Sequence, residues 1–188
     1  MKASTKYKNI LILGGARSGK SDYAQKLALK LPQPVLFVAT AEAGDEEMKQ
    51  RIEEHRKNRP ATWKTLEATA RLSDQVRREI GPIPTVIVDC VTLLVSNIFS
   101  KYLERENEPD FPELVEKDIT TEIDSLVDCM SQVEAGFIVV TNEVGQGLVP
   151  VGNMSRLYRD LLGRANCILA QNADDVYLMV AGLPVKIK

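Results

Sequence analysis

Near the N-terminus the chain reads Ile10-Leu11-Ile12-Leu13-Gly14-Gly15-Ala16-Arg17-Ser18-Gly19-Lys20-Ser21. A short, wholly apolar run such as Ile10–Leu13 predicts a strand buried on both faces, as in parallel sheets. The residues that follow fit the pattern G-x-x-x-x-G-K-[ST], and the next segment predicts a helix over Lys20–Leu31. A glycine-rich turn can match this pattern by chance, but here it lies between a strand and a helix, as the pattern requires. The segment therefore predicts a phosphate-binding loop.

Each residue type in this loop has a physical reason. Glycines let successive backbone N–H groups point inward at a phosphate, and the helix N-terminus adds partial positive charge. Lys20 can reach the outer phosphates of a nucleotide, and Ser21 can ligate Mg²⁺. Arg17 is either a further cation beside the phosphates or a solvated surface arginine. The residues assigned to phosphate binding are Gly14, Gly15, Ala16, Arg17, Ser18, Gly19, Lys20 and Ser21.

Outside the loop, short apolar runs alternate with segments of helical period. This alternation predicts one α/β domain over residues 1–188, with a mostly parallel sheet and helices on both faces. Apolar residues recur every three or four positions over Val115–Val133 and Met154–Leu169, which predicts two long helices. We also expect strands at Val35–Ala39, Val86–Val88, Phe137–Val140 and Val176–Val180, a helix at Asp45–Lys57, a mobile loop at Glu104–Pro112 and a C-terminal hairpin turning at Gly182-Leu183-Pro184.

Composition narrows the class of protein. The 188 residues are 44% hydrophobic and 27% charged, which excludes a disordered, collagen-like or coiled-coil chain. A net charge of −2 gives no basic surplus for nucleic acid. Three well-separated cysteines and a single histidine argue for reduced thiols and against a zinc site. With no membrane-length apolar run and no signal peptide, we expect a cytoplasmic protein without nucleic-acid partners or stable membrane insertion.

Two carboxylates follow predicted strands. Asp89 comes directly after the run Thr85–Val88, where a carboxylate that holds Mg²⁺ is expected, although a helix-capping Asp would look the same. Glu143 follows the run Phe137–Val140 and is a second carboxylate at a strand end, with a role as a base or metal partner or none at all. Ligands of open α/β sheets gather at this edge. These residues predict a protein that binds a magnesium nucleotide.

The only histidine, His55, lies on the expected helix Asp45–Lys57. Met48, Ile52 and His55 share one face of that helix, and basic residues surround the imidazole. His55 is either a packed or capping residue, or a nucleophile that attacks the α-phosphate of a nucleotide and holds the nucleotidyl group as a phosphoramidate. Spacing alone does not choose between these roles.

Longer blocks follow the loop in a fixed order. They are Arg51-Ile52-x-x-His55-x-x-x-Arg59-Pro60-x-x-Trp63-x-Thr65-x-Glu67, Asp89-Cys90-x-Thr92, Thr141-Asn142-Glu143-Val144-Gly145-x-Gly147-x-Val149-Pro150 and Tyr158-Arg159-Asp160-x-x-Gly163-Arg164-x-Asn166. This order and spacing resembles the family of bifunctional adenosylcobinamide kinases / adenosylcobinamide-phosphate guanylyltransferases of cobalamin biosynthesis. The resemblance runs from about Ile10 to Lys188.

The resemblance implies a RecA-like P-loop core and two reactions. A nucleoside triphosphate, GTP or ATP with Mg²⁺, phosphorylates the aminopropanol hydroxyl of adenosylcobinamide. GMP then passes from GTP through a guanylyl-histidine, which matches His55, onto adenosylcobinamide phosphate, with release of pyrophosphate. The resemblance also implies a homotrimer. By correspondence, His55 and Lys20 are catalytic, Ser21 and Asp89 bind the metal, and the nucleotide further contacts Ala39, Thr40, Ala41, Arg56, Lys57, Asn58, Arg59, Glu67 and Asp89.

Two other readings of the sequence stay open. One is a simple small-molecule kinase in which His55 is structural. The other is a nucleotide-dependent switch or assembly ATPase whose partner is a protein, although this reading gives no reason for the block from His55 to Trp63. Dependence on a corrinoid distinguishes them, because a switch hydrolyses its nucleotide slowly whether or not cobinamide is present.

Overall fold

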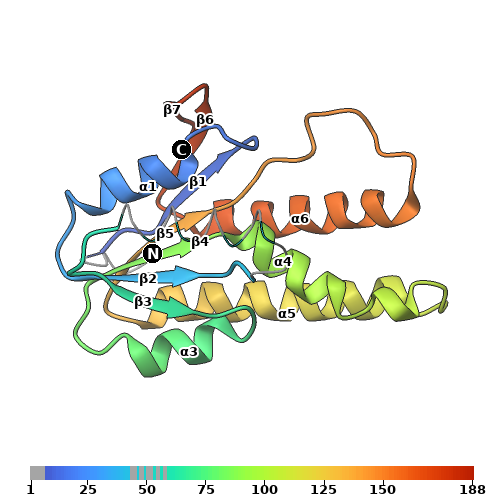
Figure 1. Ribbon diagram of the computed structural model, residues 1–188, viewed down its shortest axis with the longest axis horizontal. Coiled ribbons are helices and arrows are strands. Elements are labelled where there is room, and N and C mark those ends of the chain that lie inside the picture. The colour runs from blue at the N-terminus through green and yellow to red at the C-terminus, as the bar shows by residue number, and fades with distance from the viewer. Residues whose placement is uncertain (1–6, 43–45, 47–48, 50–52, 54–55, 57–58) are drawn as a thin grey trace.

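The computed structural model describes residues 7–42, 46, 49, 53, 56 and 59–188. In that part of the chain the strands form one seven-stranded sheet with the order β3-β2-β4-β5-β1-β6-β7 (Figure 1). All neighbouring strands run parallel except the last pair, β6 and β7, which is antiparallel. The strands are β1 (Ile10–Gly14), β2 (Val35–Ala39), β3 (Lys64–Glu67), β4 (Thr85–Asp89), β5 (Gly136–Val140), β6 (Asp175–Val180) and β7 (Leu183–Lys186).

The strand that leads into the phosphate loop is buried on both faces. β1 lies between β5 and β6 and is buried along its whole length. Ile10 and Ile12 pack into the apolar cluster on one side of the sheet, whereas Leu11 and Leu13 pack into the cluster on the other side. This alternation is the pleat of a strand covered on both faces, and it confirms the prediction made from the apolar run.

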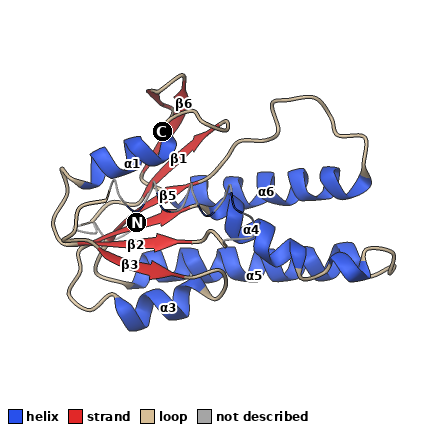
Figure 2. Cartoon of the chain, in the orientation of Figure 1, coloured by secondary structure: helices blue, strands red, loops and turns tan. Residues whose placement is uncertain are grey.

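Helices cover both faces of the sheet. α1 packs on one face, and α3, α4, α5 and α6 lie on the other (Figures 1 and 2). The predicted α/β class is therefore confirmed. The helices are α1 (Lys20–Ala28), α3 (Leu72–Glu79), α4 (Val91–Ser100), the 3₁₀ turn η1 (Leu103–Arg105), α5 (Phe111–Gln132) and α6 (Asn153–Asn172).

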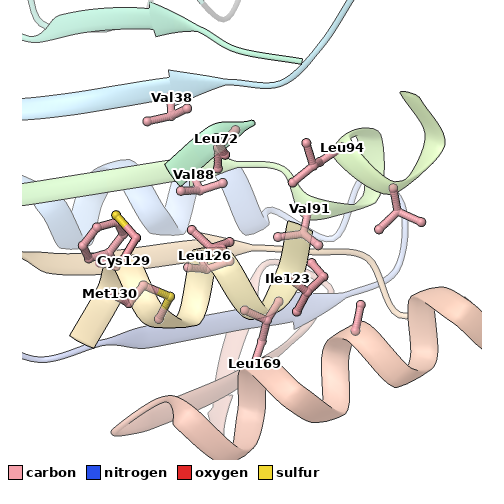
Figure 3. Close-up of a cluster of buried hydrophobic side chains, with 14 of the residues drawn as sticks. Val38, Leu72, Val88, Val91, Leu94, Ile123, Leu126, Cys129, Met130 and Leu169 are labelled. Atoms are coloured by element: carbon pink, nitrogen blue, oxygen red, sulfur yellow. The ribbon is translucent and has the colours of Figure 1, made fainter. Parts of the chain in front are cut away.

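The larger of the two apolar clusters fills the space between the sheet and α5. Figure 3 shows Ile123 and Leu126 of α5 and Leu169 of α6 beneath Val88 of β4. Each of these side chains is at most 1% exposed. This packing fixes α5 and α6 against the sheet, and it thereby fixes the segment between β5 and α6 that borders the candidate site.

Several expected boundaries differ from the observed ones. α1 ends at Ala28 rather than at Leu31, because the N–H groups of Lys30 and Leu31 donate to carbonyls three residues earlier, at Leu27 (3.0 Å) and Ala28 (3.1 Å), instead of four. The Gln33 amide also donates to the carbonyls of Ala28 (2.8 Å) and Leu31 (2.9 Å). The expected loop Glu104–Pro112 is shorter, since η1 occupies its start and α5 begins at Phe111 with a proline in the first turn. Proline is tolerated there because the N–H it lacks has no partner within the helix. The C-terminal hairpin is confirmed, but the expected position of its turn is wrong. The chain turns at Ala181 and Gly182, whereas Leu183 and Pro184 belong to β7 and pair with Val180 and Met179.

Three elements were not expected from the sequence: β3, α3 and α4. The expected helix Asp45–Lys57 lies outside the described residues, apart from positions 46, 49, 53 and 56. Among the helices that the structure describes, none combines the length and the apolar character needed to cross a bilayer.

Leu126→Ala tests the packing of α5 against the sheet. Leu126 has no exposed surface, so its truncation leaves a cavity, and we expect the free energy of unfolding to fall by about 2–5 kcal/mol. Leu29→Ala is the matched control, because Leu29 is 57% exposed and its loss should cost little. Urea denaturation followed by circular dichroism measures both variants. Equal losses in the two variants would contradict the assigned core.

Candidate functional site

The loop between β1 and α1 folds back tightly on itself. A Cβ atom on Gly14 would lie 2.6 Å from Ser18 Oγ and 2.8 Å from the carbonyl oxygen of Met179, so only glycine fits. Gly19, with φ of 88°, occupies the left-handed region at the N-cap of α1, which glycine enters at little cost. The sequence therefore places glycines where this backbone needs them.

Lys20 is the first residue of α1, and its side chain lies over the loop. The residue is 7% exposed. Its ammonium donates hydrogen bonds to the carbonyl oxygen of Gly15 (2.6 Å) and to Ser18 Oγ (3.4 Å). A lysine held over a phosphate-binding loop is in position to contact the outer phosphates of a nucleotide.

Two neighbouring segments brace the loop from outside. The N–H of Glu143, just beyond β5, donates to the carbonyl of Gly14 (3.0 Å). The N–H of Gly182, in the β6–β7 turn, donates to the carbonyl of Ser18 (3.1 Å). A Cβ on Gly19 would lie 3.3 Å from Gly182 Cα, so loop and turn are in close contact. No sequence pattern indicates that the C-terminal hairpin contacts the phosphate loop.

Three predicted site residues lie side by side at the carboxyl edge of the sheet. In the strand register, Ala39 of β2 pairs with Glu67 of β3 on one side and with Asp89 of β4 on the other. Since these strands are parallel, their ends meet the loop residues at one edge, where ligands of open sheets bind. The peptide bond between Asp89 and Cys90 is cis.

Thr40 supports this edge from within. The residue is fully buried, and its hydroxyl donates to the carbonyl of Cys90 and accepts from the Cys90 N–H, each at 2.7 Å. Its carbonyl accepts from the Asn97 amide at 2.9 Å. Thr40 therefore ties the ends of β2 and β4 together, whereas Ala41, the next residue, is partly exposed.

Burial strongly raises the pKa of the Cys90 thiol. The residue is 9% exposed, and desolvation together with the negative charge of Asp89 raises the pKa of its thiol to about 11. The thiol is therefore protonated at neutral pH, which argues against a nucleophilic cysteine.

Asp89 supplies a carboxylate at this edge, since its negative charge contributes to the raised pKa of Cys90. A serine hydroxyl and an aspartate carboxylate are oxygen donors of the kind that Mg²⁺ prefers, so Ser21 and Asp89 fit that ion. In the part of the chain that the structure describes, no three His, Cys, Asp or Glu side chains form a metal cluster.

Arg59 approaches the same edge from the side of β2. Its guanidinium lies 3.6 Å from the centre of the Phe37 ring, which stacks on Trp63 with ring centres 6.5 Å apart. Burial lowers the pKa of Arg59, and the charge of Asp89 opposes that shift. Arg59 and Trp63, two residues of the block Arg51–Glu67, thus both pack on Phe37. Close by, Arg56 forms an ion pair with Glu67 at the end of β3.

The remaining predicted residues divide into two groups. Gly15, Ala16 and Arg17 are exposed, and Ser21 is partly exposed in the first turn of α1. His55, Lys57 and Asn58 lie outside the described residues, so their predicted roles rest on the sequence.

A buried polar network connects α4, β5 and α6. Thr141 Oγ1 donates to Asn166 Oδ1 at 2.8 Å and lies 3.4 Å from Thr92 Oγ1. The Asn166 amide donates to the carbonyl of Asn142 (3.0 Å), whose own N–H donates to Thr92 Oγ1 (2.6 Å). The network fixes the segment that carries Glu143. In the sequence these residues belong to three separate motifs of the family resemblance, and nothing in the sequence indicates that their side chains are hydrogen bonded to one another.

Comparison with known proteins identifies relatives over nearly the whole chain. A family model described as cobinamide kinase / cobinamide phosphate guanyltransferase matches residues 10–187. The bifunctional adenosylcobalamin biosynthesis protein CobU of Escherichia coli is 41% identical over 180 residues, which cover 95% of this chain and 99% of that protein. CobP of Pseudomonas aeruginosa, with the same description, is 40% identical over 178 residues, covering 95% and 96%.

A solved structure shares the fold. It is an ATPase from the type III secretion system of pathogenic bacteria, with a TM-score of 0.55 and 14% identity. The match covers 95% of this chain and 56% of the ATPase chain. At this identity the likeness supports the P-loop α/β fold and no particular activity.

Asn166→Ala tests the buried network. The change leaves Thr141 and the carbonyl of Asn142 without their partner, and we expect the free energy of unfolding to fall by about 1–3 kcal/mol. Asn172→Ala is the control, because the Asn172 amide bonds only to a carbonyl one turn earlier in its own helix. Urea denaturation measures both. An Asn166→Ala protein as stable as the control would show that the network does not hold the edge together.

Alkylation of the cysteines tests whether the Cys90 thiol is buried and protonated. At pH 8 we expect iodoacetamide to label the exposed Cys167 in the native protein and to leave Cys90 almost untouched, since about one Cys90 thiol in 10³ is ionised. Labelling of Cys90 should rise about tenfold per pH unit up to about pH 11. Because folding raises this pKa from 9.0, the native state should also lose stability as pH rises between those values. Peptide mass spectrometry measures the labelling, and equal rates at pH 8 would refute this assignment.

Proposed function

The chain belongs to the cobinamide kinase / cobinamide phosphate guanyltransferase family, and we propose residue roles for the two reactions of that family. It is an enzyme of cobalamin biosynthesis that phosphorylates adenosylcobinamide and then transfers GMP from GTP to the product. One observation carries the proposal: Lys20, Asp89 and Glu143 lie around one phosphate-binding loop at the carboxyl edge of the sheet.

For the kinase step, Gly14–Ser21 holds the triphosphate of GTP or ATP, and Lys20 contacts its outer phosphates. Ser21 and Asp89 would hold Mg²⁺, which would neutralise negative charge on the phosphate oxygens. The aminopropanol oxygen of adenosylcobinamide forms a bond to the γ-phosphorus while the bond to the diphosphate breaks. Glu143 is our candidate for the base that accepts the hydroxyl proton, because its backbone N–H donates to the Gly14 carbonyl and so holds the residue beside the loop. Its carboxylate accepts a hydrogen bond from the N–H of Gly145 at 2.5 Å.

For the transferase step, His55 attacks the α-phosphorus of GTP. A phosphorus–nitrogen bond forms, and pyrophosphate leaves. An oxygen of adenosylcobinamide phosphate then attacks the same phosphorus and releases the imidazole. Arg56, Lys57, Asn58 and Arg59 follow His55 closely, and their charges and amide suit the phosphoryl oxygens. Ala39, Ala41 and Glu67 complete the nucleotide site, while Thr40 holds its backbone in place.

We also propose that the enzyme acts in the cytoplasm as a homotrimer. Four large apolar side chains of the β6–β7 hairpin support a covered surface there, since each is at least 48% exposed: Val180, Leu183, Val185 and Ile187. A contiguous apolar patch of this kind marks interaction sites more often than free surface.

A labelling pair tests the transferase role. The protein with Mg²⁺ is incubated with GTP labelled at the α-phosphate and, separately, at the γ-phosphate, and is then denatured. We expect acid-labile, base-stable label from the α position alone and none in His55→Ala. That variant should retain much of its kinase rate, because the kinase step needs the loop but not the histidine.

Lys20→Ala is the control in this experiment and should lose both activities. Guanylyl transfer that persists in His55→Ala would overturn the covalent mechanism. Absence of label in a wild-type protein that binds GTP and phosphorylates adenosylcobinamide would leave the simple kinase, with His55 as a structural residue.

A further inference from the structure

Few buried polar side-chain atoms lack a partner in this protein. Among the described residues they are Arg59 Nε, Ser73 Oγ and Arg159 Nη1. A buried guanidinium nitrogen without an acceptor is costly, because arginine cannot give up its charge. Arg59 already belongs to the proposed nucleotide site. Arg159 has no assigned role.

The other arginines of α6 are paired. Arg156 donates to the carbonyls of Pro150 (3.0 Å) and Val151 (2.5 Å), and Arg164 forms an ion pair with Glu116. These contacts fasten the start of the helix to the preceding loop and its outer face to α5. At 100° per residue, Arg159 is about 60° around the helix from Arg156 and about 140° from Arg164, so it neighbours Arg156 and faces away from the Arg164–Glu116 pair. Arg156 thus finds acceptors close by, whereas Arg159 Nη1 has none.

The helical register shows where Arg159 points. Arg159 and Asn166 are seven positions apart, which is close to two full turns, so they share one face at a spacing of about 10 Å. Asn166 faces the end of β5, where it bonds to Thr141 and to Asn142. The rotation of the helix is fixed one residue earlier, because the Tyr158 hydroxyl donates to the carbonyl of Thr92 at 3.1 Å and its ring packs edge-on against Phe99.

The N-terminal half of α6 lies beyond the carboxyl edge of the sheet. The helix has 20 residues and β5 has 5, so at about 1.5 Å and 3.3 Å per residue the helix is nearly twice as long as the strand. In Figure 1 the part of α6 that follows the long β5–α6 loop extends past the strand ends. Arg159 is therefore on the outer side of the edge, from which an acceptor approaches a nucleotide held by the loop.

From these observations, and on the basis of the function proposed above, we propose that Arg159 binds the phosphate of the phosphorylated acceptor during guanylyl transfer. A planar guanidinium can hold two phosphate oxygens at once, which suits a residue that orients an attacking phosphate. The kinase substrate carries no phosphate at that position, so Arg159 should matter for the second reaction far more than for the first. A phosphate of the nucleotide has the same chemistry, and the experiment separates the two sources.

The test compares Arg159→Gln with Arg164→Gln, a control on the same helix whose guanidinium pairs with Glu116 at the surface. Three quantities are measured for each: kcat/KM for adenosylcobinamide phosphate in guanylyl transfer, kcat/KM for adenosylcobinamide in the kinase step, and Kd for GTP by calorimetry. For Arg159→Gln we expect a loss of about 10- to 100-fold in the first quantity, as for removal of a charge-assisted bond. The other two should stay within about twofold of wild type.

A GTP Kd weakened by a similar factor, with both reactions impaired, would assign the contact to the nucleotide phosphates and overturn the acceptor assignment. Unchanged values in a folded Arg159→Gln protein would overturn any phosphate role. If Arg159→Gln does not fold, Arg159→Lys replaces it, since lysine keeps the charge and stem but cannot bind two oxygens in parallel; the same selective loss is expected. Wild-type protein inactive on both corrinoids would refute the proposed function itself, which is a separate result.

Discussion

The end of β1 has no room for a side chain, and the candidate site depends on that constraint. A Cβ at Gly14 would collide with Ser18 and with the backbone of β6, so the chain can turn there only as glycine. Because it turns so tightly, the Gly14 carbonyl meets the N–H of Glu143, and the Lys20 ammonium reaches back to Gly15. The parallel register then aligns the ends of the neighbouring strands with the loop. One steric constraint thus gathers residues from distant parts of the chain at one edge.

The buried polar network behind this edge positions the backbone by hydrogen bonding, whereas Gly14 does so by steric constraint. Thr92, Thr141 and Asn166 are each at most 7% exposed, and their polar groups bond to one another or to the backbone beside Glu143. In a medium of low dielectric constant, a partly satisfied network is worse than none. The backbone after β5 is therefore held in one favourable position, and with it the residue Glu143.

The sequence predicted what depends on local pattern and missed what depends on contact. Buried strands and the long amphipathic helices α5 and α6 carry strong periodic signals, and the loop motif has a fixed relation to its strand and helix. β3 is an edge strand of four residues with three exposed, so it carries almost no pattern. α4 is apolar on most of its surface because it is enclosed by α5, α6 and the sheet, and this hides its period. The hydrogen bond from Gly182 to Ser18 connects segments more than 160 residues apart, and no local pattern in a single sequence indicates such a contact.

The cations near the carboxyl edge of the sheet are held locally, and the chain has no general positive charge. The chain as a whole carries a net charge of −2, so it has no general attraction for polyanions. Its cations near the edge are instead held in place by packing: Lys20 by the loop, Arg59 by the ring of Phe37, and Arg159 by a helix whose rotation Tyr158 and Asn166 fix. Groups fixed before the substrate arrives need little reorganisation when negative charge shifts between phosphates. Arg59 Nε and Arg159 Nη1 are buried without an acceptor among the described residues, which is destabilising. The phosphate contacts proposed for these two arginines would give each guanidinium an acceptor.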